Sequence, residues 1–113
     1  MNDPLVIDTS VLIGLLGSAD PKMLREMLWL YRETETETPA ILRGLVDAKD
    51  SVGLAKAAHA AKGAAVSAGA MRLAALCKDI ENKASQEDWQ RMGDLCAQVD
   101  SAFADVCRFI ETF

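Results

Sequence analysis

The chain has 113 residues and a mass of 12.2 kDa, with 50% apolar and 26% charged residues. This length predicts one domain, residues 1–113, with a core that needs no disulfide or metal, and it argues against a multi-domain enzyme. The net charge of −5 and the isoelectric point near 4.7 argue against binding to nucleic acid or an anionic membrane, since both require a basic face.

The amino-terminal stretch 1–17, MNDPLVIDTSVLIGLLG, is apolar but does not resemble a signal peptide. It has no basic segment, and the acidic Asp8 lies inside it. The chain contains no run of about 18 apolar residues, so we expect no membrane span. The stretch instead predicts a short helix over Thr9–Leu16 that begins at Asp8 or Thr9 and ends at Gly17.

Residues 21–49 predict a second helical segment. Its apolar residues recur at helical spacing at Leu24, Leu28, Tyr31, Leu42 and Leu45. Asp20 and Pro21 suit the cap and the first turn. Pro39 lacks a backbone donor, so we expect a kink or break near Thr34–Pro39. The run ETETET at this bend predicts a solvated acidic face.

Residues 51–68 and 70–84 predict two further helices, divided near Gly69. The last segment has the most regular apolar stripe, at Trp89, Met92, Cys96, Val99, Phe103, Val106, Ile110 and Phe113. Ser85 and Asp88 have the spacing of a capping box, which predicts that this helix begins at Ser85. The expected fold is therefore all-α, an antiparallel four-helix bundle with a short additional amino-terminal helix.

The three cysteines, Cys77, Cys96 and Cys107, are odd in number and lack C-x-x-C spacing. This pattern disfavours a disulfide framework or a zinc ribbon and favours a reducing compartment. We therefore expect a cytoplasmic protein.

The only histidine, His59, lies on an unusual face of the helix predicted over 51–68. At about 100° per residue, one face carries Ala55, Lys56, His59, Lys62, Gly63 and Val66. The other side and its flanks carry Leu54, Ala57, Ala58, Ala61, Ala64, Ala65 and Ala68. Because the alanine side suits close helix packing, we expect His59 to be exposed.

The residues around His59 suit phosphoryl chemistry. Nearby lysines favour the neutral, nucleophilic imidazole and attract the charge of a phosphoryl group. Gly63, one turn later, removes side-chain bulk beside the ring. The alternative is that His59 is an ordinary surface histidine and Gly63 a small residue at a helix crossing.

The stretch AHAAKGAAVSAGAMRLAALCKDIE, residues 58–81, resembles the signature of histidine-containing phosphotransfer (HPt) domains, aHxLKGxxxxxGaxxLxxxcxxlE. The matching residues are Ala58, His59, Lys62, Gly63, Gly69, Ala70, Leu73, Cys77 and Glu81. The upstream VIDTSVLIGLLGSADPKMLREMLWLYRE also resembles the first two helices of the family, so the resemblance covers essentially the whole chain. Ala61, where the family usually has leucine, and Pro39 depart from the pattern.

The resemblance implies a phosphorelay intermediate. His59 would accept a phosphoryl group from a receiver-domain aspartate and pass it to another receiver. Lys62 would orient and neutralise the phosphoryl group, and Gly63 would give the receiver access. The helical wheel adds Lys56 as a further electrostatic residue.

The implied partners are response-regulator receiver domains and a hybrid sensor histidine kinase, which would dock on Ala55 and Val66 and on parts of the first helix. The chain itself would need no cofactor or metal, since the receiver supplies Mg²⁺, and its size suits a monomer. It has no glycine-rich nucleotide loop, so it would carry phosphate without taking it from ATP.

Three alternatives belong to other classes of protein. A helical bundle could dock receivers without carrying phosphate. VIDTSVLIGLL also resembles the opening strand of PIN-type nucleases, in which Asp8 would bind a metal in an α/β fold. His59 could instead bind a metal together with Cys77 from the next helix.

Overall fold

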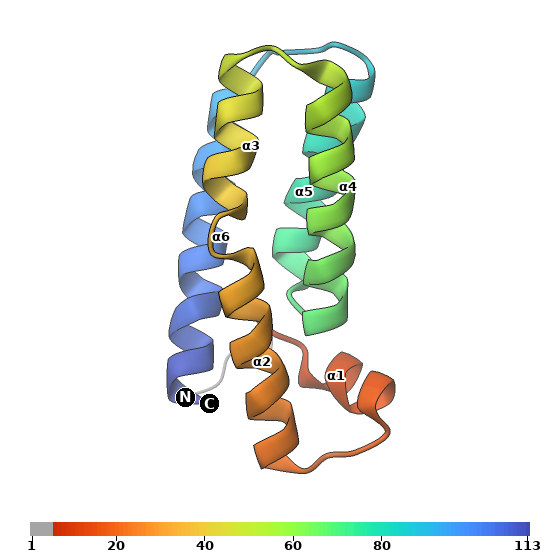
Figure 1. Cartoon of the computed structure of the whole chain (residues 1–113), viewed down its shortest axis with the longest axis vertical. Coiled ribbons are helices and arrows are strands. Elements are labelled where there is room, and N and C mark those ends of the chain that lie inside the picture. The colour runs from red at the N-terminus through yellow and green to blue at the C-terminus, as the bar shows by residue number, and fades with distance from the viewer. Residues whose placement is uncertain (1–5) are drawn as a thin grey trace.

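The computed structural model describes residues 6–113, and within them it has six α-helices (Figure 1). The helices are α1 (Thr9–Leu16), α2 (Pro21–Glu35), α3 (Thr38–Asp47), α4 (Ser51–Ala68), α5 (Met71–Ser85) and α6 (Met92–Thr112). The pair α2 and α3 forms one arm of an elongated antiparallel four-helix bundle, and α4, α5 and α6 form the other three. The short α1 packs against α4 at one end. The expected all-α fold is confirmed. Within 6–113, no helix is long and apolar enough to cross a bilayer.

The expected break in the second segment lies between α2 and α3. α2 ends at Glu35 and α3 begins at Thr38, with Pro39 in its first turn, where the missing N–H of proline costs no helical hydrogen bond. The acidic run is only partly solvated, because Glu35 is half-buried and accepts a hydrogen bond from Thr38 Oγ1 at 3.1 Å.

α6 begins later than the sequence predicts. Ser85 is the last residue of α5, and α6 begins at Met92, after Arg91 in the left-handed region (φ 59°). Asp88 instead accepts hydrogen bonds from the backbone N–H of Gln90 at 3.1 Å and from Lys83 Nζ at 3.0 Å. Because these contacts occupy Asp88 within the loop, the predicted capping box does not form. From Met92 onward the apolar stripe faces the core as predicted, and its two phenylalanines, Phe103 and Phe113, are half-buried.

Small residues allow α4 to pack closely against α5. The buried residues of α4 are Leu54, Ala58, Ala61, Ala65 and Ala68. Gly69 ends α4 in the left-handed conformation (φ 78°), and the backbone N–H of Ala70 donates to Ala65 O at 2.8 Å. This turn is the common glycine stop of a helix, and it sets α5 antiparallel beside α4.

Ala61, which departs from the family pattern, lies on a tightly filled part of the core. It lines a small void of about 10 Å³, room for about one water molecule. The other lining residues are Tyr31, Glu35, Thr38, Pro39, Leu73, Cys77, Val99 and Phe103. The rings of Tyr31 and Phe103, which both line the void, lie 6.4 Å apart.

We predict that Ala61→Leu destabilises the protein by about 1–3 kcal/mol, because the void is too small for three added carbons and the core must shift. Denaturant unfolding measures the change. The matched control is Ala60→Leu, one residue earlier on the exposed surface, which should change stability by no more than about 0.5 kcal/mol. Equal stability of Ala61→Leu and the wild type would contradict the close packing described above.

Candidate functional site

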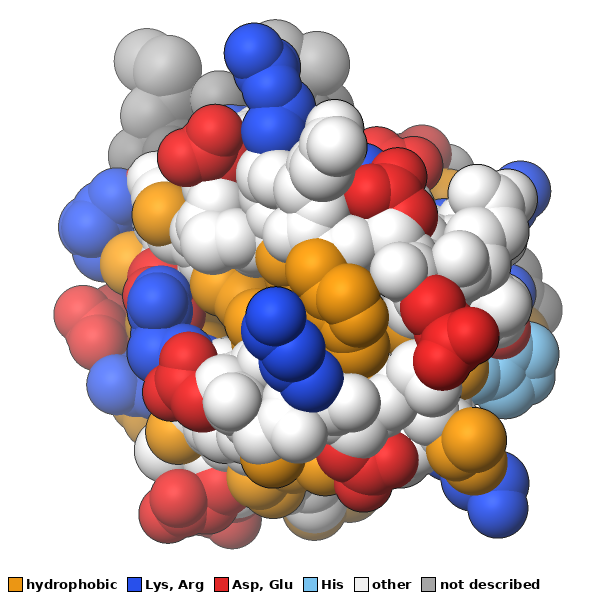
Figure 2. Space-filling model, turned by 90° about the horizontal axis from the view of Figure 1, so that it is seen from above, with side chains coloured by type: hydrophobic (Ala, Val, Ile, Leu, Met, Phe, Trp, Pro, Cys, Tyr) orange, Lys and Arg blue, Asp and Glu red, His pale blue; other side chains and the backbone are white. Residues whose placement is uncertain are grey.

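His59 projects from the outer face of α4. Its side chain is 66% exposed, and in Figure 2, which looks along the bundle from above, the histidine stands at the rim of the molecule. The residues predicted to share this face are placed as expected: Lys56, Gly63 and Val66 are exposed, and Ala55 and Lys62 are half-buried. A straight helix therefore holds the imidazole at the surface.

A carboxylate from the neighbouring helix holds one nitrogen of the imidazole. Glu81 Oε2, on α5, lies 2.9 Å from His59 Nδ1. Since an ionised carboxylate only accepts hydrogen bonds, Nδ1 carries the ring proton and donates a hydrogen bond to Glu81. In a neutral ring this tautomer leaves Nε2 with a free lone pair. From the sequence, Glu81 is only a match to the signature, with no predicted role.

The same carboxylate also contacts Lys62. Lys62 Nζ lies 3.6 Å from Glu81 Oε1, on the other oxygen of the carboxylate. The lysine expected beside His59 is therefore near it, and it is paired with the group that holds the ring. Lys56 lies exposed about one turn before His59 on α4. The site thus combines one imidazole, one carboxylate and two ammonium groups.

Gly63 leaves open space beside the imidazole. A Cβ built at this position would meet no atom of residues 6–113 within 4 Å, apart from the local helix backbone and chain neighbours. The packing of the chain itself therefore does not require glycine here. A glycine inside a helix costs about 1 kcal/mol relative to alanine. Since packing within residues 6–113 does not explain this cost, glycine at 63 favours a role in contact with another molecule.

An apolar groove of about 220 Å³ lies between α1, α2 and α4. It is lined by Leu12, Met27, Leu30, Tyr31, Thr34, Ala64, Ser67 and Ala68. Ser67 links it to the histidine face, because Ser67 Oγ donates to Gly63 O at 3.1 Å. Met27 and Leu30 are partly exposed, 38% and 51%. The sequence predicts a contribution to docking from the first helix but none from α2.

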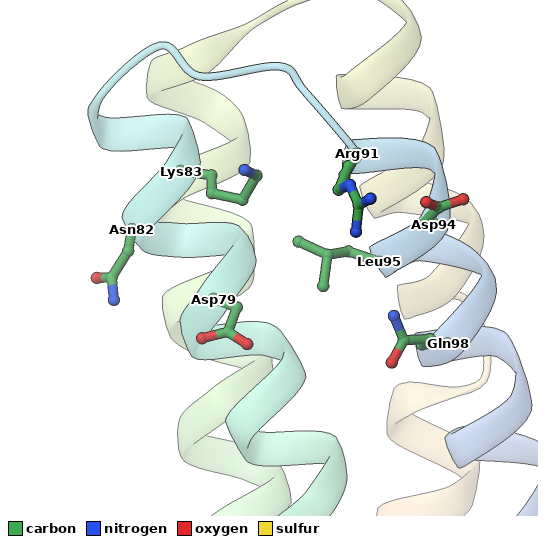
Figure 3. Close-up of a pocket in the computed structure, with 7 residues that line it drawn as sticks. All are labelled: Asp79, Asn82, Lys83, Arg91, Asp94, Leu95 and Gln98. Atoms are coloured by element: carbon green, nitrogen blue, oxygen red, sulfur yellow. The ribbon is translucent and has the colours of Figure 1, made fainter.

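A second hollow of about 340 Å³ lies between α5 and α6 (Figure 3). Asp79, Asn82, Lys83, Arg91, Asp94, Leu95 and Gln98 line it. The side chains of Lys83 and Arg91 point into it, whereas that of Asn82 points away. None of the predicted site residues lines this hollow, so it is separate from the His59 site.

The two metal alternatives do not fit the fold. Asp8 caps α1, where its side chain accepts from the N–H of Ser10 at 3.0 Å, and the described residues contain no sheet of the kind a PIN-type site needs. Cys77 is buried in the core. Burial, and then the charge of Glu35, raise the pKa of the Cys77 thiol to about 11, which keeps it protonated. In the part of the chain that the structure describes, no three His, Cys, Asp or Glu side chains group to hold a metal.

Comparison with known proteins identifies the family. The model of the Hpt domain family matches residues 26–109. The crystal structure of histidine-containing phosphotransfer protein B (HptB) from Pseudomonas aeruginosa PAO1 is similar, with a TM-score of 0.83 and 27% sequence identity over 94% of this chain and 91% of that chain. A search of curated proteins found no match. Since the family model covers well over half of the sequence, this chain belongs to the Hpt family, the histidine phosphotransfer domains of phosphorelays.

Proposed function

We propose that residues 1–113 form a phosphorelay intermediate that accepts a phosphoryl group on His59 from a receiver-domain aspartate and passes it to another receiver. The observation that carries the proposal is the pairing of His59 with Glu81: Nδ1 is held at 2.9 Å, while the side chain is 66% exposed. An imidazole held in this way presents Nε2 to an incoming phosphorus atom.

Transfer onto His59 exchanges one bond for another. The lone pair of Nε2 attacks the phosphorus of the aspartyl phosphate, a P–N bond forms, and the P–O bond to the aspartate breaks. The electron pair of that bond returns to the receiver as a carboxylate. The ring gains positive charge, and Glu81 stabilises it through the Nδ1–H hydrogen bond. The reverse steps deliver the group to the next receiver.

The charged residues around His59 have separate roles in this proposal. Glu81 orients the ring, as carboxylates commonly do for histidines in active sites. Lys62, 3.6 Å from Glu81, keeps the carboxylate in place, and its ammonium would stabilise the charge of the phosphoryl oxygens. Lys56 adds positive charge on the exposed face. The receiver supplies the acidic pocket and its Mg²⁺, so the chain needs no cofactor.

Docking would use the apolar groove beside the histidine face together with Val66 and Ala55. The groove lies on the α2 side of α4, and Val66 is 39% exposed. A modest patch of this kind suits a transient complex, because a carrier must release each partner after transfer. The partners are receiver domains, including that of a hybrid sensor histidine kinase, and the carrier acts as a monomer.

The direct test is transfer from a panel of radiolabelled, aspartyl-phosphorylated receivers. We predict label on the wild-type chain that is acid-labile and base-stable, and no label on His59→Gln. His59 is exposed and lies outside the core, so the variant should keep its helix content and remain within about 0.5 kcal/mol of the wild-type stability. Circular dichroism and thermal unfolding check the fold.

Label on His59→Gln at the wild-type rate would contradict the assignment of His59. A folded wild-type chain that binds a receiver but takes no label would instead support the docking bundle that carries no phosphate.

Gly63 offers a second test, because a small side chain there should raise stability and a long one should slow transfer. Gly63→Ala should stabilise the free protein by about 0.5–1 kcal/mol, since a Cβ there meets no described atom within 4 Å. Gly63→Gln, whose side chain projects beside His59, should slow transfer from the receiver markedly. Denaturant unfolding and transfer kinetics measure the two effects.

The matched controls for these variants are Gly44→Ala and Gly44→Gln. Gly44 lies inside α3, and a Cβ there also meets no atom of the described chain within 4 Å. Each Gly44 variant should change stability in the same direction as the corresponding Gly63 variant and should leave transfer unchanged. Wild-type transfer by Gly63→Gln would remove the access role of Gly63.

A further inference from the structure

The turn between α4 and α5 touches the start of α1. The backbone N–H of Asp8 donates to Gly69 O at 2.8 Å. A Cβ built at Gly69 would lie 2.3 Å from the backbone oxygen of Asp8 and 3.1 Å from its carbonyl carbon. Both atoms belong to the backbone, so no side-chain rotation could relieve the overlap. Glycine at 69 is therefore required by this contact as well as by its positive φ of 78°.

The contact reaches α1 because Asp8 is the residue at which α1 begins. The Asp8 side chain accepts from the N–H and the hydroxyl of Ser10, and its carbonyl accepts from the N–H of Val11 at 3.2 Å. One turn further, Leu12 is buried and forms the α1 wall of the apolar groove. A displacement of Asp8 from Gly69 would therefore move Leu12 and open that wall.

We propose that Gly69 is a positioning residue for receiver docking: it lets the Asp8 backbone seat on the α4–α5 turn and so fixes α1 as one wall of the docking groove. The inference rests on the proposed function, because it assumes that the groove receives the receiver domain. It assigns Gly69 no contact with the phosphoryl group. His59 lies more than two helical turns before Gly69 on α4, and its pairing with Glu81 does not involve α1.

The test compares two phosphoryl donors on Gly69→Ala. The first is a receiver that phosphorylates the wild-type chain, and this reaction needs docking. The second is phosphoramidate, which is small and transfers its phosphoryl group to imidazole with release of ammonia. We expect KM for the phosphorylated receiver to rise about tenfold, with kcat changed little. The rate with phosphoramidate should stay at the wild-type value. Amide hydrogen exchange should show faster exchange within α1.

The matched control is Gly17→Ala. Gly17 ends α1 with a φ of 67°, so alanine there meets similar left-handed strain, but its Cβ would have no described atom within 4 Å. This variant should retain the wild-type KM for the receiver. Gly69→Asn serves as a second variant if Gly69→Ala folds poorly, because asparagine tolerates the left-handed region best among residues with a Cβ.

Each outcome is decisive. A folded Gly69→Ala or Gly69→Asn with the wild-type receiver KM and unchanged exchange in α1 would overturn the role of Gly69. Equal losses with both donors would also overturn it, since they would indicate damage to His59.

A wild-type chain that accepts phosphate from neither donor would contradict the proposed function. If Leu30→Glu, in the groove, leaves KM unchanged while transfer continues, docking occurs elsewhere and the proposal fails.

Discussion

The close antiparallel packing of α4 against α5 is the constraint on which the site depends. Alanines on the buried side of α4 let the two helices approach, and the left-handed turn at Gly69 reverses the chain between them. As a result Glu81, twenty-two residues after His59, lies within 2.9 Å of its ring. A slight rotation of either helix would separate the two side chains. The core of the bundle therefore sets the orientation of the imidazole at its surface.

In the proposed transfer, this arrangement holds the nucleophile His59 on a packed helix and leaves its side chain 66% exposed. Phosphoryl transfer requires mainly positioning and charge stabilisation, and in the proposed carrier α4 and Glu81 of α5 provide both. Gly63 and Gly69 serve opposite purposes in this account. A Cβ at Gly63 would meet no atom of residues 6–113 within 4 Å, apart from the local helix backbone and chain neighbours, which leaves room for the proposed partner, whereas Gly69 is closely covered by the Asp8 backbone and leaves room for the chain itself.

Most of the fold could be predicted from patterns within single segments. Caps at Asp8 and Asp20, the stop at Gly69 and the break before Pro39 are local, and all lie where the sequence predicts. The predicted start of α6 is wrong because two patterns compete for one residue. Asp88 has the spacing of a capping-box partner for Ser85, but it pairs with Lys83 and caps Gln90 instead. Only the three-dimensional position of Lys83 decides between these uses.

The exposed face of α4 was also predictable, because it follows from the spacing of alanines and charged residues. The contact between Glu81 and His59 was not, since it depends on the relative rotation of two helices that are separate in the sequence. The groove was missed for the same reason: Met27, Leu12 and Ser67 come from three helices. The family signature could have indicated Glu81, because it ends on that residue, but the signature alone gives no geometry.

The most direct measurement for the central claim is NMR of the chain with ¹⁵N-labelled imidazole, at a pH where the ring is neutral. The account predicts that His59 carries its proton on Nδ1, that Glu81→Gln keeps this tautomer, and that Glu81→Ala loses it. Asp79→Ala, in which α5 is altered at the second hollow, is the matched control and should have no effect. After phosphorylation, ³¹P should couple to Nε2. A proton on Nε2 in the wild type, or phosphorus on Nδ1, would contradict the claim that Glu81 prepares His59 for transfer.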